Sequence, residues 1–156
     1  MKKMENHLIE IVNRQRKIKI GLEILRDFTD RAVNEIAEAS GKSLTIAFVS
    51  DRRMRQLNSS FRGVKSTTDV LSFPSEPDEF EVSSELPSMA DEHLGDVVIS
   101  LQQARKQASE NNLDFGTEIR QLILHGILHL CGCDHETDDG EMNERELELR
   151  DKLEIM

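Results

Sequence analysis

Three histidines within eleven residues are the part of this chain best suited to chemistry. They occur in the stretch His-Gly-Ile-Leu-His-Leu-Cys-Gly-Cys-Asp-His, as His125, His129 and His135. His125 and His129 are four residues apart, so on a helix both rings project from the same face. Gly132 can end that helix in a left-handed conformation, after which the chain returns with the third histidine. Three neutral imidazoles with one position open to water form a catalytic zinc arrangement, so the stretch predicts one zinc ion.

The residues around these histidines leave alternatives open. A single histidine on an apolar helix is usually a buried core residue, but here three of the five histidines lie together, which favours a metal site. Cys131 and Cys133 are too close in sequence for a good structural disulfide and are compatible with a reducing cytosol. Either cysteine is a candidate fourth ligand, although small buried residues at a helix end are the favoured interpretation.

The residue after the first histidine separates this stretch from a known kind of zinc protease. Metzincin proteases read H-E-x-x-H-x-x-G-x-x-H, with the glutamate as general base. Here the position is Gly126, so peptide hydrolysis by that mechanism is disfavoured. A glycine inside a helix costs about 1 kcal/mol relative to alanine, which predicts close approach of a substrate or another helix.

Composition fits a single globular domain over residues 1–156, which is 37% hydrophobic and 32% charged. No apolar run reaches the roughly 18 residues of a membrane span, and no signal peptide is visible, so a cytoplasmic protein without a membrane partner is expected. The net charge of −10 argues weakly against nucleic acid as a partner, and no DNA partner is expected. Residues 1–65 nevertheless hold 14 Lys and Arg against 8 Asp and Glu, which allows a basic face for an anionic ligand.

Hydrophobic periodicity predicts an α+β fold: a small mixed four-stranded sheet packed with helices, with the zinc site at the end of a buried central helix. Asp51, Ser100 and Thr117 are the expected caps of three helices. Residues 74–92 hold all three prolines and are expected to form an irregular loop, for example a lid. The expected strands are 7–13, 43–50, 68–73 and 95–99, and the expected helices are 17–39, 52–58, 101–111, 118–131 and 141–155.

The histidine stretch is similar to the H-G-x-L-H-L-x-G-x-D-H signature of the YbeY family, metal-dependent endoribonucleases of bacterial ribosomal RNA maturation. Four upstream segments, Leu57-Asn58, Phe61-Arg62, Thr67 to Pro74 and Leu94 to Ser100, extend the resemblance over about half of the chain. The sequence departs at Cys133, where the family has an aromatic residue.

This resemblance implies zinc bound by His125, His129 and His135, and Arg62 as the cationic residue needed for RNA cleavage. It also implies a single-stranded RNA substrate, including the 3′ end of the small-subunit (16S) ribosomal RNA, and a role in ribosome quality control with the small subunit or its associated factors as partners.

The residues themselves are compatible with these roles. Arg62 is expected in a loop between a short helix and a strand, from which a guanidinium can bind a phosphate with two hydrogen bonds. It could equally be an ordinary surface arginine. The absence of Trp and Tyr predicts weak base stacking and therefore a weak sequence preference. Arg52, Arg53, Arg55 and Lys65 are candidates for further phosphate contacts, and Asp69, Asp96 and Asp134 for orienting a histidine or activating water.

The leading hypothesis is a zinc-dependent endoribonuclease acting on single-stranded ribosomal RNA in the cytoplasm. One alternative is a metal hydrolase of amides or small phosphoesters, because the ligand spacing is shared with proteases. The other is a non-enzymatic ribosome assembly factor in which a cysteine closes a structural zinc site.

Overall fold

The computed structural model describes residues 8–75, 93–132 and 140–156. Within these residues the chain forms four strands and five helices. In chain order they are β1 (Ile9–Asn13), α1 (Leu22–Glu35), β2 (Ser43–Val49), α2 (Asp51–Arg62), β3 (Val70–Pro74), β4 (His93–Ser100), α4 (Leu101–Glu110), α5 (Phe115–Leu130) and α6 (Glu141–Lys152).

The four strands form one mixed sheet in the order β1-β2-β4-β3. β1, β2 and β4 are parallel, and β3 runs antiparallel to β4 at the edge. Parallel neighbours need a crossover connection, which α1 provides between β1 and β2. The predicted α+β fold with a mixed four-stranded sheet is therefore confirmed. The predicted lid, residues 74–92, lies outside the described residues from residue 76 onward.

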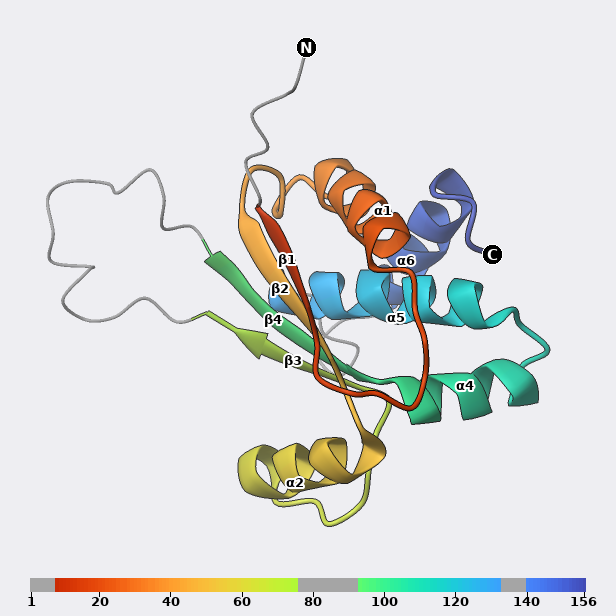
Figure 1. Cartoon of the computed structure of the whole chain (residues 1–156). Helices are drawn as coiled ribbons and strands as arrows, with labels where there is room; N and C mark the ends of the chain where they lie inside the picture. The colour runs from red at the N-terminus through yellow and green to blue at the C-terminus, as the bar shows by residue number, and fades with distance from the viewer. Residues whose placement is uncertain (1–7, 76–92, 133–139) are drawn as a thin grey trace, which may run out of the picture.

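The two faces of the sheet bury different helices because side chains alternate along each strand. On one face the strands pack against α1, α5 and α6, which Figure 1 shows together on the same side of the sheet. On the other face α2 covers a smaller cluster made of Val49, Met54, Leu71 and Val98. The larger cluster holds the central helix, and α2 is a separate layer next to the edge strand β3.

α5 is the buried central helix that the sequence predicts. Ten of its sixteen residues are buried, and the helix crosses behind the sheet in Figure 1. Between residues 121 and 130, only His125 and His129 are not buried. No helix in the described part of the chain is long and apolar enough to cross a membrane. The two histidines are thus the accessible positions in the last ten residues of α5.

Gly126 brings α5 close to the sheet. A Cβ at this position would lie 2.7 Å from Cγ1 of Val97 on β4 and 3.3 Å from Oγ of Ser72 on β3. The Ser72 hydroxyl also donates a 3.3 Å hydrogen bond to the Gly126 carbonyl. The expectation that a substrate or another helix approaches this glycine is wrong, because the sheet does so.

Gly126→Ala is expected to lower the free energy of unfolding by up to about 2 kcal/mol. Overpacking a buried site costs about 1–3 kcal/mol, and the better helix propensity of alanine returns about 1 kcal/mol. Val97 is fully buried and β-branched, so it cannot rotate away cheaply. Urea unfolding measures the change. Gly116→Ala, in the first turn of the same helix, is the control, because its nearest contact is a side-chain oxygen 3.2 Å away. Equal stability of the two variants would contradict the close approach.

α1 is shorter than the predicted helix 17–39 at both ends. Before it, the Gln15 side chain accepts a hydrogen bond from the Ile18 N–H and donates one to the Ile18 carbonyl, so this backbone is satisfied without a helix. After it, Ile36 has extended dihedral angles and the chain turns towards Gly41, whose φ is +82°. The apolar spacing continues beyond the helix because Ile18 and Ile36 are core residues in turns.

Two predicted caps are wrong by a few residues, and the third is confirmed. Ser50, not Asp51, caps α2 by accepting a hydrogen bond from the Arg53 N–H. Asp114, not Thr117, caps α5, and the Thr117 N–H is the donor to it. Ser100 caps α4 as expected. A carboxylate or hydroxyl next to a helix start is a strong signal, but it does not fix which neighbouring polar residue accepts the bond.

Candidate metal and phosphate site

His125 and His129 meet at their ring nitrogens. Their Nε2 atoms are 3.0 Å apart and their ring centroids 4.5 Å apart. Two nitrogens bound to one tetrahedral zinc ion at 2.0–2.1 Å would be about 3.3 Å apart. The pair therefore fits two ligands of a single zinc ion with little movement.

The third predicted ligand, His135, lies outside the described residues, as do Cys133 and Asp134. Among the residues that are described, no group of three His, Cys, Asp or Glu side chains could hold a metal ion. Gly132 has a φ of +87°, so the predicted left-handed turn at the end of α5 is confirmed. Cys131 is the half-buried C-cap residue and packs against the main core. The chain thus turns sharply just beyond the histidine pair, three residues before His135.

The carboxylate of Glu146 on α6 contacts the ring nitrogen of His125 that is not next to His129. Its Oε1 atom is 2.6 Å from Nδ1 of His125, and its Oε2 atom accepts a 2.6 Å hydrogen bond from Nη2 of Arg150. If Nδ1 carries the hydrogen and donates it to Glu146, the lone pair on Nε2 faces His129 and is available to a metal. This carboxylate–histidine arrangement is the usual support of a histidine that binds zinc.

Glu146 is suited to this support because it is buried and charged. Burial by itself would raise the pKa of Glu146, but the hydrogen bond and charge of His125, together with Arg150, hold the pKa below its ordinary value. Glu146 was not among the predicted site residues. The sequence nevertheless marks it, because Glu146 shares a helical stripe with the buried residues Met142, Leu149 and Leu153. An acidic residue on the apolar side of a helix needs a partner.

Glu146→Gln is expected to weaken zinc binding about 10–100-fold, the usual effect of losing such a support. The amide keeps the size of the side chain but removes the charge that favours the correct orientation of the His125 ring. Chelator competition with the purified protein measures the zinc dissociation constant without any activity assay. Glu148→Gln is the matched control, since Glu148 is exposed on the same helix. An unchanged dissociation constant in a folded Glu146→Gln protein would contradict the role.

Arg62 and the two histidines line one cavity of about 390 Å³. The prediction that Arg62 lies in a loop is wrong, because α2 continues to Arg62 itself. Gly63, with a φ of +68°, then ends the helix, and the Asn58 side chain donates a 2.8 Å hydrogen bond to the Ser66 carbonyl of the following loop. The end of α2, the edge strand β3 and α5 therefore bring a cation and the histidine pair to the same cavity. The complete lining is Arg62, Asp69, Val70, Leu71, Ser72, His125 and His129.

The Arg62 side chain is exposed at this cavity. Within the described residues it makes no hydrogen bond or ion pair with another side chain. An arginine without a protein partner presents all of its N–H donors to a ligand, and its planar fork matches a phosphate. The cavity thus combines a phosphate-binding group with a pair of metal-binding nitrogens.

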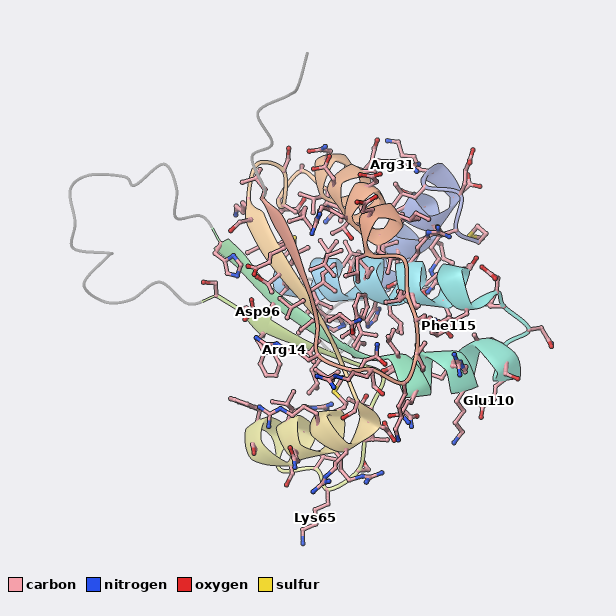
Figure 2. The ribbon with its side chains drawn as sticks, viewed as in Figure 1. Arg14, Arg31, Lys65, Asp96, Glu110 and Phe115 are labelled. Atoms are coloured by element: carbon pink, nitrogen blue, oxygen red, sulfur yellow. The ribbon has the colours of Figure 1, made fainter. Side chains whose placement is uncertain are left out.

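Of the other candidate site residues, Asp69 lines this cavity and the rest of those described lie elsewhere. Asp69 lines it, although Oδ1 also accepts a 2.8 Å hydrogen bond from the Val70 N–H. Asp96 does not line it and instead pairs with His93 at 3.0 Å. Arg52, Arg55 and Lys65 line a separate hollow on α2, from which Lys65 extends away from the rest of the molecule (Figure 2).

Comparison with known proteins identifies the family of this chain. Residues 10–154 match the family model described as endoribonuclease YbeY. The chain is 36% identical over 149 residues to endoribonuclease YbeY of Clostridioides difficile, covering 92% of this chain and 94% of the relative. It is 40% identical over 130 residues to endoribonuclease YbeY of Nautilia profundicola, covering 83% and 86%. The solution structure of TM1509 from Thermotoga maritima superposes with a TM-score of 0.61 at 28% identity, covering 93% of this chain and 88% of that one. The chain belongs to the YbeY family of endoribonucleases.

Proposed function

We propose that this protein is a zinc-dependent endoribonuclease that cuts single-stranded ribosomal RNA. The observation that carries the proposal is the cavity that Arg62 lines together with the His125–His129 pair. Two imidazoles at this separation, with a carboxylate hydrogen-bonded to one of them, are suited to hold a zinc ion, which supports the proposal. His135 is proposed as the third ligand, which leaves one position open.

The proposed mechanism is hydrolysis of a phosphodiester. A zinc ion held by His125, His129 and His135 would supply Lewis-acid charge and would lower the pKa of a bound water towards neutrality. Arg62 binds the non-bridging phosphate oxygens and stabilises the negative charge that grows on them in the transition state. Glu146 keeps His125 in the orientation and tautomer that a ligand needs. Asp69 is a carboxylate in the same cavity and is the candidate to accept a proton from the attacking water.

The proposed substrate is unpaired RNA. The reactive groups lie in a cavity between β3 and α5, where an unstacked nucleotide fits more easily than a base-paired one. The proposed target is the 3′ end of the small-subunit ribosomal RNA, in the cytoplasm and beside the small subunit, with a role in ribosome quality control.

A test of the activity uses one metal-analysed preparation with three substrates. A single-stranded oligonucleotide from the 3′ end of the small-subunit ribosomal RNA should be cut, whereas the same strand in a duplex and an unstructured peptide should not. Peptide cleavage with intact RNA would favour the amide hydrolase instead. A protein that holds zinc and cuts neither substrate would favour the assembly factor.

A further inference from the structure

A second cavity of about 370 Å³ adjoins the first along α5. The two share three lining residues, Asp69, Val70 and His125. The second cavity, here called the α4–α5 pocket, continues away from Arg62 towards α4 and the end of α6. Its remaining lining residues are Gln107, Asn111, Leu113, Glu118, Gln121, Leu122 and Arg150. A strand of RNA with its phosphate at Arg62 would therefore have an adjacent nucleotide at the α4–α5 pocket.

The α4–α5 pocket has a chemistry different from that of a phosphate site. Glu118 is only 4% exposed, and the one hydrogen bond described for its side chain, from the Asn111 amide, is long at 3.5 Å. Together with Asp69 it places two carboxyl groups on the pocket wall, which disfavour a phosphate. Carboxyl oxygens instead accept hydrogen bonds from neutral N–H groups. The pocket is thus suited to the polar edge of a base.

Two further side chains of the pocket can form hydrogen bonds with a base. Arg150 lines the pocket with a side chain that is 26% exposed, and its guanidinium carries N–H donors besides the one that bonds to Glu146. The Gln107 side chain adds an amide that both donates and accepts. A ligand that presents neighbouring N–H donors and a carbonyl acceptor would match this set. Among the four RNA bases, guanine has two adjacent N–H donors beside a carbonyl on its Watson–Crick edge.

We propose that the α4–α5 pocket binds a guanine next to the phosphate that is cut, with Glu118 accepting from the base and Arg150 donating to it. This inference rests on the proposed function, because it assigns a subsite of the same groove. The lack of Trp and Tyr limits selection by stacking, but hydrogen bonds in a recessed pocket read a base edge without a large aromatic platform. The nuclease therefore prefers RNA with guanine beside the cleavage position.

The first test measures cleavage rates on single-stranded oligonucleotides with one guanine at the mapped cleavage site. Replacing that guanine with inosine, which lacks the 2-amino group, or with adenine should lower kcat/KM about tenfold, the size expected for one good base contact. Glu118→Gln and Asn111→Ala should each reduce this preference. Glu110→Gln is the control, because Glu110 is exposed at the outer end of α4 and should retain it (Figure 2).

The second test needs no cleavage. Zinc-loaded protein is titrated with guanosine, adenosine and uridine 5′-monophosphates, with amide chemical shifts and thermal melting recorded for each variant. Guanosine monophosphate should bind about tenfold more tightly than the other two and shift residues of α4 and α5. Equal binding of all three, or a preference unchanged in folded Glu118→Gln and Asn111→Ala, would overturn the proposal. Failure of RNA cleavage alone would instead count against the proposed function.

Discussion

The His129→Ala variant is expected to lose its zinc and to cut single-stranded RNA at least about a hundredfold more slowly than the unaltered protein. Nε2 of His129 lies 3.0 Å from Nε2 of His125, so alanine removes one of two converging ligands. The side chain is on the accessible side of an otherwise buried helix, so the fold should survive its removal. Metal analysis of the purified protein and single-turnover RNA cleavage measure the two losses.

His93→Ala is the matched control for His129→Ala. His93 belongs to β4, where its ring contacts Ser43 and Asp96 and does not line the cavity. This variant should keep its zinc and its cleavage rate. Cleavage that persists undiminished in His129→Ala would point to a contaminating nuclease and remove the main evidence for this mechanism.

Arg62→Ala is expected to reduce RNA cleavage about 10²–10³-fold while leaving zinc binding unchanged. A group that stabilises charge only in the transition state contributes on this scale. Arg62→Lys should recover only part of the rate, because an ammonium keeps the charge but cannot form two parallel hydrogen bonds with a phosphate. Cleavage rates at saturating RNA, together with zinc content, distinguish this effect from a loss of the metal.

Arg53→Ala provides the comparison on the same helix. Arg53 is exposed, donates to Gln56 and lines neither the cavity nor the hollow on α2. Its removal should change cleavage only slightly. Equal losses in the two variants would mean that α2 acts through its general positive charge, and loss of zinc from Arg62→Ala would mean that the arginine is structural.

Local sequence patterns predicted the central helix and its histidine pair well. A four-residue spacing on an apolar helix fixes the relation between His125 and His129, and Gly132 ends that helix as its freedom of φ allows. The strands of the sheet were likewise predicted from runs of β-branched residues that end at turn residues. These features depend on residues close in sequence, so periodicity is enough to find them.

Features that depend on particular side-chain contacts, most of them between residues distant in sequence, were missed or misplaced. Gln15 replaces a helical turn by bonding to the Ile18 backbone, which periodicity cannot show. Glu146 is 21 residues from His125, and only the packing of α6 beside α5 brings them together. The same holds for the α4–α5 pocket, whose walls come from β3 and three helices. Gly126 was singled out correctly, but its neighbour is the sheet.

The most direct test of the central claim is a zinc titration of the metal-free protein, with RNA cleavage and bound zinc measured in the same samples. The cavity of Arg62, His125 and His129 predicts that cleavage of single-stranded RNA rises in proportion to bound zinc and levels off at about one ion per chain. The Arg62→Ala protein should bind the same zinc with little cleavage. Full cleavage by protein that holds no metal would contradict the account.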